Sequence, residues 1–500
     1  MSKIQPSQAQ FIQLAKKFNT IPVWMDVLGD METPVSAYLK LCGEHKGFLL
    51  ESVEGGEHQA RYSFIGIKPI ARIVSQKNST ELIHQTGRIE KFAYSNPVDA
   101  LKKIMSRFVY AQSPKLPSFC GGAVGYMSYE CSQIFEPKVP KSKGKGNYPL
   151  MEYLIVTQMI VFDHLKRQLK ILSNVHIPKG ASLDKKKSLY AKAVDDIKEI
   201  QRQLQCTTPD SILNQNGKLK AGNKVKSNMS KKDFIAGVKA IKREIHRGEA
   251  IQVVLSRKFT KTTHVSPINL YRSLRSVNPS PYTFFLNCGD HQLIGSSPEV
   301  HVKSINGKVE LRPIAGTRPR GKNALEDKKF EKSLLADPKE VAEHVMLVDL
   351  GRNDLGRVCK VGSVKVSEFM NIEKYSHVMH IVSHVQGDLE PKKDVYDIIK
   401  ATFPAGTVSG APKVRAMQII AKHEKAHRGP YAGLVGYLSF SGNFDSCITI
   451  RTILINDGCI EIQAGAGIVS DSNPESEWQE SANKAMGLLK AIDVAERGLL

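Results

Sequence analysis

Short apolar runs separated by turn residues are the feature that most limits how this 500-residue chain can fold. They occur at 46–75, 153–172, 251–260, 281–314, 431–442 and 444–467. Helical patterns are interspersed at about 184–205, 231–247, 337–350 and 474–491. Strand and helix do not alternate strictly, which argues against a doubly wound parallel sheet. The order predicts an α+β fold of mostly antiparallel sheets, forming a β-sandwich-like core covered by helices.

A polar stretch at 206–230 divides the chain into two parts. It is rich in Asn, Ser and Lys and holds few hydrophobic side chains, which is typical of a mobile linker. We therefore expect an N-terminal region at 1–205, a flexible linker at 206–230 and a second domain at 231–500.

The formal net charge of +22 allows two classes of partner, nucleic acids and acidic small molecules. The lysine-rich part of the chain, at about 178–233, lacks the series of interleaved aromatic side chains on which single-strand binders stack bases. We therefore interpret the charge mainly as a solubility feature, with no nucleic-acid partner.

The sequence also bears on the compartment. No apolar run approaches the roughly 20 residues of a membrane span, and the first residues lack the apolar segment of a signal peptide. The eight cysteines are scattered without a C-x-x-C pair, so we interpret them as reduced thiols. These features predict a cytoplasmic protein with no membrane partner.

The segment "RPIAGTRPRG", residues 312–321, has the composition of an anion-binding loop. From the residues alone, the anion could be a nucleic-acid backbone, a nucleotide phosphate or a small carboxylate. The chain holds no G-x-x-x-x-G-K-[ST] motif, and "GAGIVS" lacks the third glycine of a dinucleotide turn.

Two predicted helices carry acidic residues that could bind a metal. In 337–350, Glu343 lies toward an apolar face, where either an ion pair or a metal or catalytic role explains it. In 474–491, Glu480 fits an i,i+4 salt bridge with Lys484. It also fits a magnesium site shared with Glu343.

Three other features have structural as well as functional interpretations. Gly465 to Gly467 in "QAGAGIV" form either a plain β-turn or a turn that lets the backbone approach a ligand closely. Arg451 is either a surface residue of a strand or part of a sheet face that lines a site. His380 is either a hydrogen-bonded structural histidine or a catalyst.

The order of several motifs resembles the chorismate-utilising enzymes, and most closely the large subunits of anthranilate synthase. The resemblance covers nearly the whole chain and is densest between about 230 and 490. The motifs are "GEAIQVVLSRKF", "IGSSPE", "RPIAGTRPRG", "AEHVMLVDLGRND", "YSHVMHIVSHV", "FPAGTVSGAPKVRAM", "GPYAGLVGY", "CITIRT" and "QAGAG".

The resemblance implies a lyase of tryptophan biosynthesis. Ammonia adds to C2 of chorismate with Mg²⁺ bound, pyruvate is then eliminated, and anthranilate results. The anion expected at 312–321 is then chorismate, a small dicarboxylate. The resemblance assigns substrate binding to Gly316, Thr317, Tyr431, Arg451, Gly465, Ala466, Gly467 and Lys484, and Mg²⁺ binding to Glu343 and Glu480.

Four catalytic positions follow from the same resemblance. Glu299 is the general acid that protonates the departing C4 hydroxyl. His380 and Thr407 are tied to the second half-reaction, with His380 as proton acceptor or orienter. Gln252 stands where the water-adding isochorismate synthases carry a lysine base, which favours ammonia over water.

The alternative within the family is aminodeoxychorismate synthase component I, of the folate pathway. Those relatives typically carry lysine in "PIKGT" as a covalent nucleophile, whereas this chain has Ala315, which cannot attack C2. The residue favours direct attack by ammonia.

The resemblance also implies feedback inhibition by tryptophan. The segment "LLES" of the N-terminal regulatory region would meet "NPSPYTFFL" of the catalytic domain to form the inhibitor site. Ser52, Pro281, Tyr282 and Thr283 would be the contacts, although methionine is usual at the position of Thr283.

No glutaminase-type cysteine nucleophile is evident in the chain. Free ammonia is scarce at neutral pH, where most of it is ammonium without a lone pair. We therefore expect a heteromer with a glutamine amidotransferase small subunit that delivers ammonia.

Overall fold

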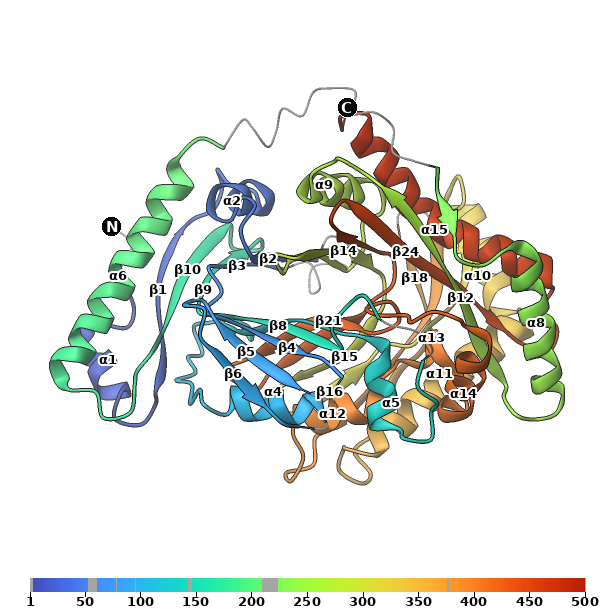
Figure 1. Ribbon diagram of the computed structural model, residues 1–500, viewed down its shortest axis with the longest axis horizontal. Coiled ribbons are helices and arrows are strands. Elements are labelled where there is room, and N and C mark those ends of the chain that lie inside the picture. The colour runs from blue at the N-terminus through green and yellow to red at the C-terminus, as the bar shows by residue number, and fades with distance from the viewer. Residues whose placement is uncertain are drawn as a thin grey trace.

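Two large antiparallel sheets form the centre of the molecule (Figure 1). The computed structural model describes residues 3–52, 61–77, 79–94, 96–142, 146–208, 224–375 and 378–499. Within these residues each sheet has 12 strands, and every pairing between named strands is antiparallel. The predicted α+β class is confirmed.

The strands of the first sheet follow one another in space in an order that differs from their order in the chain. They are β1 (Thr20–Leu28), β10 (Gln168–His176), β9 (Gln158–Asp163), β3 (Tyr62–Ile67), β2 (Gly47–Glu51), β13 (Tyr282–Asn287), β14 (His291–Ser297), β23 (Thr452–Asn456), β24 (Cys459–Ile468), β12 (Gln252–Thr262) and β11 (Lys226–Ser227), with β20 (Gly410–Ala411) also paired to β12.

The second sheet mixes early and late strands in the same way. It contains β17 (Ile314–Pro319), β19 (Val378–Asp388), β16 (Lys308–Leu311), β15 (Val300–Ile305), β22 (Phe444–Ile448), β21 (Leu434–Ser439), β7 (Gly122–Met127), β8 (Met151–Val156), β4 (Ala71–Ser75), β5 (Thr80–His84) and β6 (Ile89–Phe92), with β18 (Lys365–Lys374) also paired to β19.

Helices cover the outer faces of both sheets. In chain order they are α1 (Gln8–Leu14), α2 (Pro34–Leu41), α4 (Pro97–Met105), α5 (Ser132–Phe135), α6 (Leu183–Gln205), α8 (Lys231–His246), α9 (Pro267–Val277), α10 (Ala324–Leu335), α11 (Pro338–Gly356), α12 (Val395–Thr402), α13 (Gly406–Ser409), α14 (Lys413–His423) and α15 (Pro474–Glu496).

The hydrophobic core has layers that match this arrangement. One cluster lies between the two sheets and joins residues such as Phe48 and Phe284 of the first sheet to Tyr126 and Val435 of the second. A second cluster packs α1, α2, α6, α9 and α15 on the outer face of the first sheet. A third packs α4, α11 and α12 on the second sheet. The result is a β-sandwich between two helical layers.

The helical periodicity in the sequence has its expected physical cause. In α8, Phe234, Val238, Ile241 and Ile245 are all buried on one face. At the start of α15, the side chain of Asn473 accepts hydrogen bonds from the backbone of the first turn. The predicted helices near 184–205, 231–247, 337–350 and 474–491 are confirmed as α6, α8, α11 and α15.

The parts of the chain before and after the predicted linker share both sheets. β2 pairs with β13, with Leu49 opposite Phe285, and β7 pairs with β21. Residues 209–223 of the predicted linker lie outside the described residues, while its described end includes β11, which pairs with β12. The predicted division, into 1–205, 206–230 and 231–500, stays a prediction about function. In the structure both parts of the chain contribute strands to the same two sheets.

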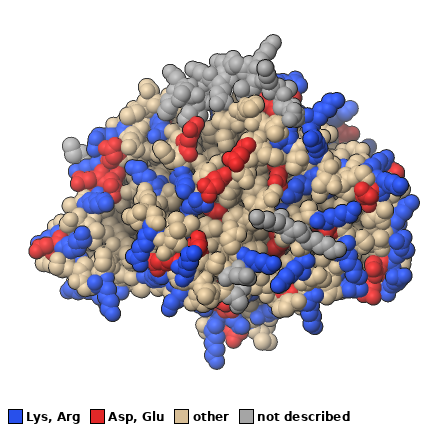
Figure 2. Space-filling view, viewed as in Figure 1, with Lys and Arg blue, Asp and Glu red and all other residues tan. Residues whose placement is uncertain are grey.

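The surface charge is spread out. On the face seen in Figure 2, lysines and arginines alternate with acidic residues and do not gather in one stripe. Among the described residues, no helix is both long enough and apolar enough to cross a membrane.

Candidate active site

The proposed site residues come from seven elements or their ends, of which α11, α13, α15 and β12 lie to the right in Figure 1. Gln252 begins β12, Glu343 lies in α11, Thr407 in α13, and Glu480 and Lys484 in α15. Glu299 lies between β14 and β15, and His380 in β19. Hydrogen bonds and electrostatic effects, described below, connect them into one site.

Two carboxylates approach each other from α11 and α15. Burial raises the pKa of Glu343, and the nearby carboxylates of Glu340 and Glu480 raise it further. The Gln252 amide donates to Glu343 Oε1 at 3.3 Å. Glu480 also forms the i,i+4 salt bridge with Lys484, at 2.6 Å. Both interpretations of Glu480 are therefore compatible with the geometry.

The residues present fit a hard divalent cation. Within the described chain, no Lys or Arg forms an ion pair with Glu343, and its carboxyl is partly buried beside a second carboxylate. Bringing a cation between them would relieve the repulsion that raises the pKa. Carboxylate oxygens are the ligands Mg²⁺ prefers.

A second group of possible metal ligands, Glu152, Cys288 and His291, lies elsewhere. These three residues are buried, but Arg72 pairs with Glu152 at 2.7 Å and the hydroxyl of Tyr126 lies 2.9 Å from His291 Nε2. A guanidinium already neutralises the carboxylate, and thiol and imidazole are poor ligands for Mg²⁺. This group does not replace the Glu343 and Glu480 pair.

Glu299 has an environment suited to proton donation. Burial raises its pKa from 4.5 to about 7, while Thr407 and Lys484 oppose this rise. A carboxyl with this pKa is protonated in about half of the molecules at neutral pH. The Thr407 hydroxyl is buried and lies close enough to the Glu299 carboxyl to lower its pKa by hydrogen bonding.

His380 lies in β19 and is opposite Thr317, directly after the bulge in β17. Its Nδ1 lies 2.8 Å from the carbonyl oxygen of Gly316 and 3.1 Å from Thr317 Oγ1. Since a carbonyl only accepts, Nδ1 carries the hydrogen and Nε2 has the free lone pair. Burial lowers the pKa of His380. The ring is therefore neutral and can accept a proton at Nε2.

The loop expected at 312–321 is wrong, because most of this segment is a strand, whereas substrate binding by Gly316 and Thr317 stays a prediction. Residues 314–319 form β17, paired with β19, and the register shifts between Ala315 and Thr317. Gly316 at this bulge has φ +69°, which favours glycine.

The three arginines of this segment form ion pairs with acidic residues of the same chain. Arg312 pairs with Glu373. Arg318 lies 2.7 Å from Asp337 and 3.2 Å from Glu340, and Arg320 lies 2.8 Å from Asp327. These acids come from β18 and from the beginning of α10 and α11. The sequence does not show that they would lie beside the strand.

Arg451 instead supplies a guanidinium to the site. It lies between β22 and β23 with φ +51°, and its Nη1 donates to the carbonyl oxygen of Lys484 at 2.6 Å. Burial lowers its pKa, and Tyr431 and Glu480 are close enough to oppose this effect. Arg451, Tyr431 and Lys484 are thus brought together as predicted.

Gly465 to Gly467 lie inside β24 and do not form the predicted turn. Gly465 is opposite Ser256 and Gly467 is opposite Val254 in β12. A Cβ on Gly467 would lie 2.5 Å from Gln252 Nε2, and one on Gly465 would lie 2.6 Å from the Leu255 carbonyl oxygen. The glycines permit close packing of Gln252 and the two strands.

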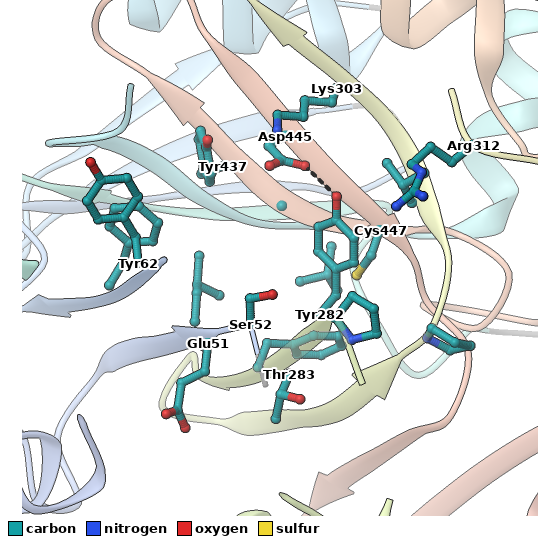
Figure 3. Close-up of a pocket in the computed structure, with 18 of the residues that line it drawn as sticks. Glu51, Ser52, Tyr62, Tyr282, Thr283, Lys303, Arg312, Tyr437, Asp445 and Cys447 are labelled. Atoms are coloured by element: carbon teal, nitrogen blue, oxygen red, sulfur yellow. Dashed lines mark hydrogen bonds between the residues drawn. The ribbon is translucent and has the colours of Figure 1, made fainter. Parts of the chain in front are cut away.

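A separate cavity of about 240 Å³ lies between the two sheets (Figure 3). It is lined by all four residues predicted for the inhibitor site, which are Ser52, Pro281, Tyr282 and Thr283. The Thr283 hydroxyl donates its hydrogen bond to the Ser280 carbonyl oxygen at 3.1 Å, and therefore not to a group in the cavity.

Sequence reasoning missed the other wall of this cavity. Tyr282 donates to Asp445 at 3.0 Å, and Lys303, Tyr437 and Cys447 line the same space. Burial raises the pKa of Asp445, and Lys303 opposes the rise. The available signal was the presence of polar residues at inward positions of β15 and β22, where a sandwich core is otherwise apolar.

The fold and site define the class: the chain belongs to the chorismate binding enzymes, whose family model matches residues 46–490. It is 48% identical over 487 residues to anthranilate synthase component 1 of Acetivibrio thermocellus, covering 96% of this chain and 97% of that protein. It is 45% identical over 491 residues to anthranilate synthase component 1 of Aquifex aeolicus (strain VF5), covering 97% of each.

Solved structures agree with this assignment. Anthranilate synthase component I from Streptococcus pneumoniae TIGR4 superimposes with a TM-score of 0.76 at 34% identity, covering 92% of this chain and 98% of that one. The menaquinone-specific isochorismate synthase from Escherichia coli has a TM-score of 0.70 at 19% identity and covers 97% and 99%. The second comparison concerns the fold alone.

Proposed function

We propose that the chain is the large subunit of an anthranilate synthase, which converts chorismate and ammonia to anthranilate, pyruvate and water. The observation that carries the proposal is the single site in which Glu299, His380 and Arg451 surround the Glu343 and Glu480 pair. The similarity to anthranilate synthase component 1 over nearly the full length of each chain supports it.

Substrate binding follows from charge. Arg451 and Lys484 are cationic partners for the chorismate carboxylates, and the arginine fork can make two parallel bonds. Gly316, Thr317, Tyr431 and the β24 segment 465–467 complete the proposed contact surface. Glu343 and Glu480 would hold Mg²⁺, which neutralises the substrate carboxylate and fixes its position.

In the first step, the ammonia lone pair forms a bond to C2, the ring double bonds shift, and the C4 hydroxyl leaves. Glu299 donates its proton to that hydroxyl, so the leaving group is water. The Gln252 carbonyl Oε1 is buried without a hydrogen bond in the described chain and can accept an N–H of ammonia. An amide cannot deprotonate water, which favours amination.

In the second step, the C2 hydrogen leaves as a proton and the enolpyruvyl oxygen leaves C3. The ring becomes aromatic, and the enol takes up a proton to give pyruvate. His380, neutral with a lone pair on Nε2, is the proposed proton acceptor. Thr407 would assist in this half through its buried hydroxyl, which lies beside Glu299.

Nitrogen delivery and regulation complete the proposal. A glutamine amidotransferase small subunit would supply ammonia to this cytoplasmic enzyme. Tryptophan would bind the cavity of Figure 3 and inhibit. Residues 231–500 contribute every proposed catalytic residue, and residues 1–205 contribute Ser52 to the inhibitor site, which supports the predicted functional division.

The test is a turnover assay with chorismate, Mg²⁺ and an ammonium salt, with the product identified by chromatography. We expect ortho-aminobenzoate. Formation of aminodeoxychorismate, which yields para-aminobenzoate after a lyase is added, would favour aminodeoxychorismate synthase component I. Absence of chorismate consumption would refute both.

A further inference from the structure

A buried ion pair that no step of the reaction uses lies beside the candidate active site. Glu424 follows α14 and Arg428 comes four residues later; their side chains are 7% and 1% exposed. Arg428 Nε donates to Glu424 Oε2 and Nη2 donates to Oε1, both at 2.7 Å. Burial disfavours the charged guanidinium, but Glu424 more than offsets this and the pKa of Arg428 is raised.

Arg428 reaches two elements of the site through its remaining donors. Nη1 donates to the carbonyl oxygen of Val408 at 2.7 Å, directly after Thr407. Nη2 also donates to the carbonyl oxygen of Val254 at 3.0 Å, and Val254 is opposite Gly467 in the sheet. One rigid guanidinium therefore fixes α13 relative to β12.

The same guanidinium and its carboxylate reach two more elements. Arg428 Cζ lies 5.7 Å from the ring centroid of Tyr431. Glu424 Oε1 accepts from the backbone N of Ser256 at 2.8 Å and from its Oγ at 2.7 Å. Ser256 is opposite Gly465 in β24. The pair thus contacts Tyr431 and β12, the strand that pairs with the 465–467 segment of β24.

We propose that Glu424 and Arg428 are positioning residues of the reaction, which hold Thr407, Tyr431 and the 465–467 segment in register around chorismate. Neither residue touches the substrate in this scheme. An isolated buried ion pair adds little net stability, whereas a small displacement of catalytic groups costs a large factor in rate. The inference rests on the proposed function.

The test measures kcat/KM for chorismate with Mg²⁺ and excess ammonium in the wild type, Glu424→Gln and Arg428→Lys. We expect a loss of about 100-fold for Glu424→Gln. We expect Arg428→Lys to remain impaired, because one ammonium cannot replace the fork to Glu424, Val254 and Val408. The matched control is Glu152→Gln, which breaks a buried arginine pair, with Arg72, outside the site.

Stability separates positioning from folding. Circular dichroism and thermal unfolding should show comparable destabilisation in Glu424→Gln and the control, while only Glu424→Gln loses kcat/KM. Equal activity losses in the two variants, or full activity of Arg428→Lys, would overturn the inference. An inactive wild type would overturn the proposed function and the inference with it.

A second variant decides the matter if Glu424→Gln does not fold. Ser256→Ala removes the hydroxyl hydrogen bond to Glu424 and the one that the hydroxyl accepts from Gln463, and it leaves both charges paired. We expect a slightly lower unfolding temperature, because buried hydrogen bonds are lost, with kcat/KM lowered about tenfold. A folded Ser256→Ala enzyme with unchanged kinetics would overturn the inference.

Discussion

Replacing Glu299 with glutamine should make the enzyme inactive and more stable at the same time. Glutamine keeps the shape of the side chain but cannot donate a carboxylic proton to the C4 hydroxyl. General acids contribute about 10²–10⁴-fold to rate, so kcat should fall within that range. The stability gain follows from the burial that raises the pKa of Glu299 from 4.5 to about 7.

The sign of the pH dependence follows from that raised pKa. Below pH 4.5, Glu299 is protonated in both the folded and the unfolded chain, so its ionisation does not change the free energy of unfolding. Between pH 4.5 and 7 the unfolded chain ionises more readily, so wild-type stability relative to Glu299→Gln falls. Above pH 7 the difference in the free energy of unfolding between the two proteins is constant. Each pKa unit corresponds to about 1.4 kcal/mol, so the rise from 4.5 to about 7 amounts to about 3 kcal/mol. For a chain of this length that is roughly 3 °C in Tm.

The assay compares thermal unfolding of wild type and Glu299→Gln at pH 5 and pH 8, beside chorismate consumption at a fixed concentration of free ammonia. In the wild type, kcat should fall about tenfold per pH unit above 7, as Glu299 loses its proton. Asp163→Asn is the control of opposite sign: burial raises the pKa of Asp163, but its ion pair with Arg61 more than offsets this and the pKa is lowered, so the substitution should lower Tm at pH 8. A fully active Glu299→Gln, or one less stable than wild type at pH 8, would refute the reasoning.

Three further outcomes test the rest of the site. Glu343→Gln and Glu480→Gln should each nearly abolish turnover with unchanged circular dichroism, and near-normal activity at low Mg²⁺ would contradict the metal assignment. His380→Met should still consume chorismate but release aminodeoxyisochorismate, detected by chromatography; loss of all chorismate consumption would show another role. The isolated chain should use ammonium at alkaline pH but not glutamine, and adding the small subunit should confer glutamine-dependent activity at neutral pH.

The sequence predicted the elements whose pattern is local. Apolar spacing located α8, and caps and first-turn residues located the starts of α11 and α15. Turn residues between short apolar runs predicted antiparallel strands. The spatial order of the strands could not be predicted, because β2 pairs with β13 more than 200 residues away and no local signal encodes that contact.

The same limit explains the errors at the site. "RPIAGTRPRG" carries three cations in ten residues, and composition alone cannot show whether acids elsewhere neutralise them. Arg318 meets Asp337 and Glu340 only because the start of α11 packs on β17. "QAGAG" was predicted as a turn because glycine is common in turns. In the structure it is part of a strand, where Gly467 leaves room for the Gln252 side chain of the neighbouring strand β12.

One short segment lies between the proposed inhibitor cavity and a small cavity beside Thr407. Pro298 lines the cavity between the sheets, Glu299 lines the small cavity beside Thr407, and Val300 contacts both cavities. Neighbouring side chains of extended backbone point to opposite sides, so Pro298 and Glu299 face different cavities. The backbone amide of Ile448 donates to the Glu299 carbonyl oxygen at 3.0 Å, while Cys447 lines the larger cavity. The position of the proposed general acid is therefore set by the same strand ends that form the wall of the proposed inhibitor site.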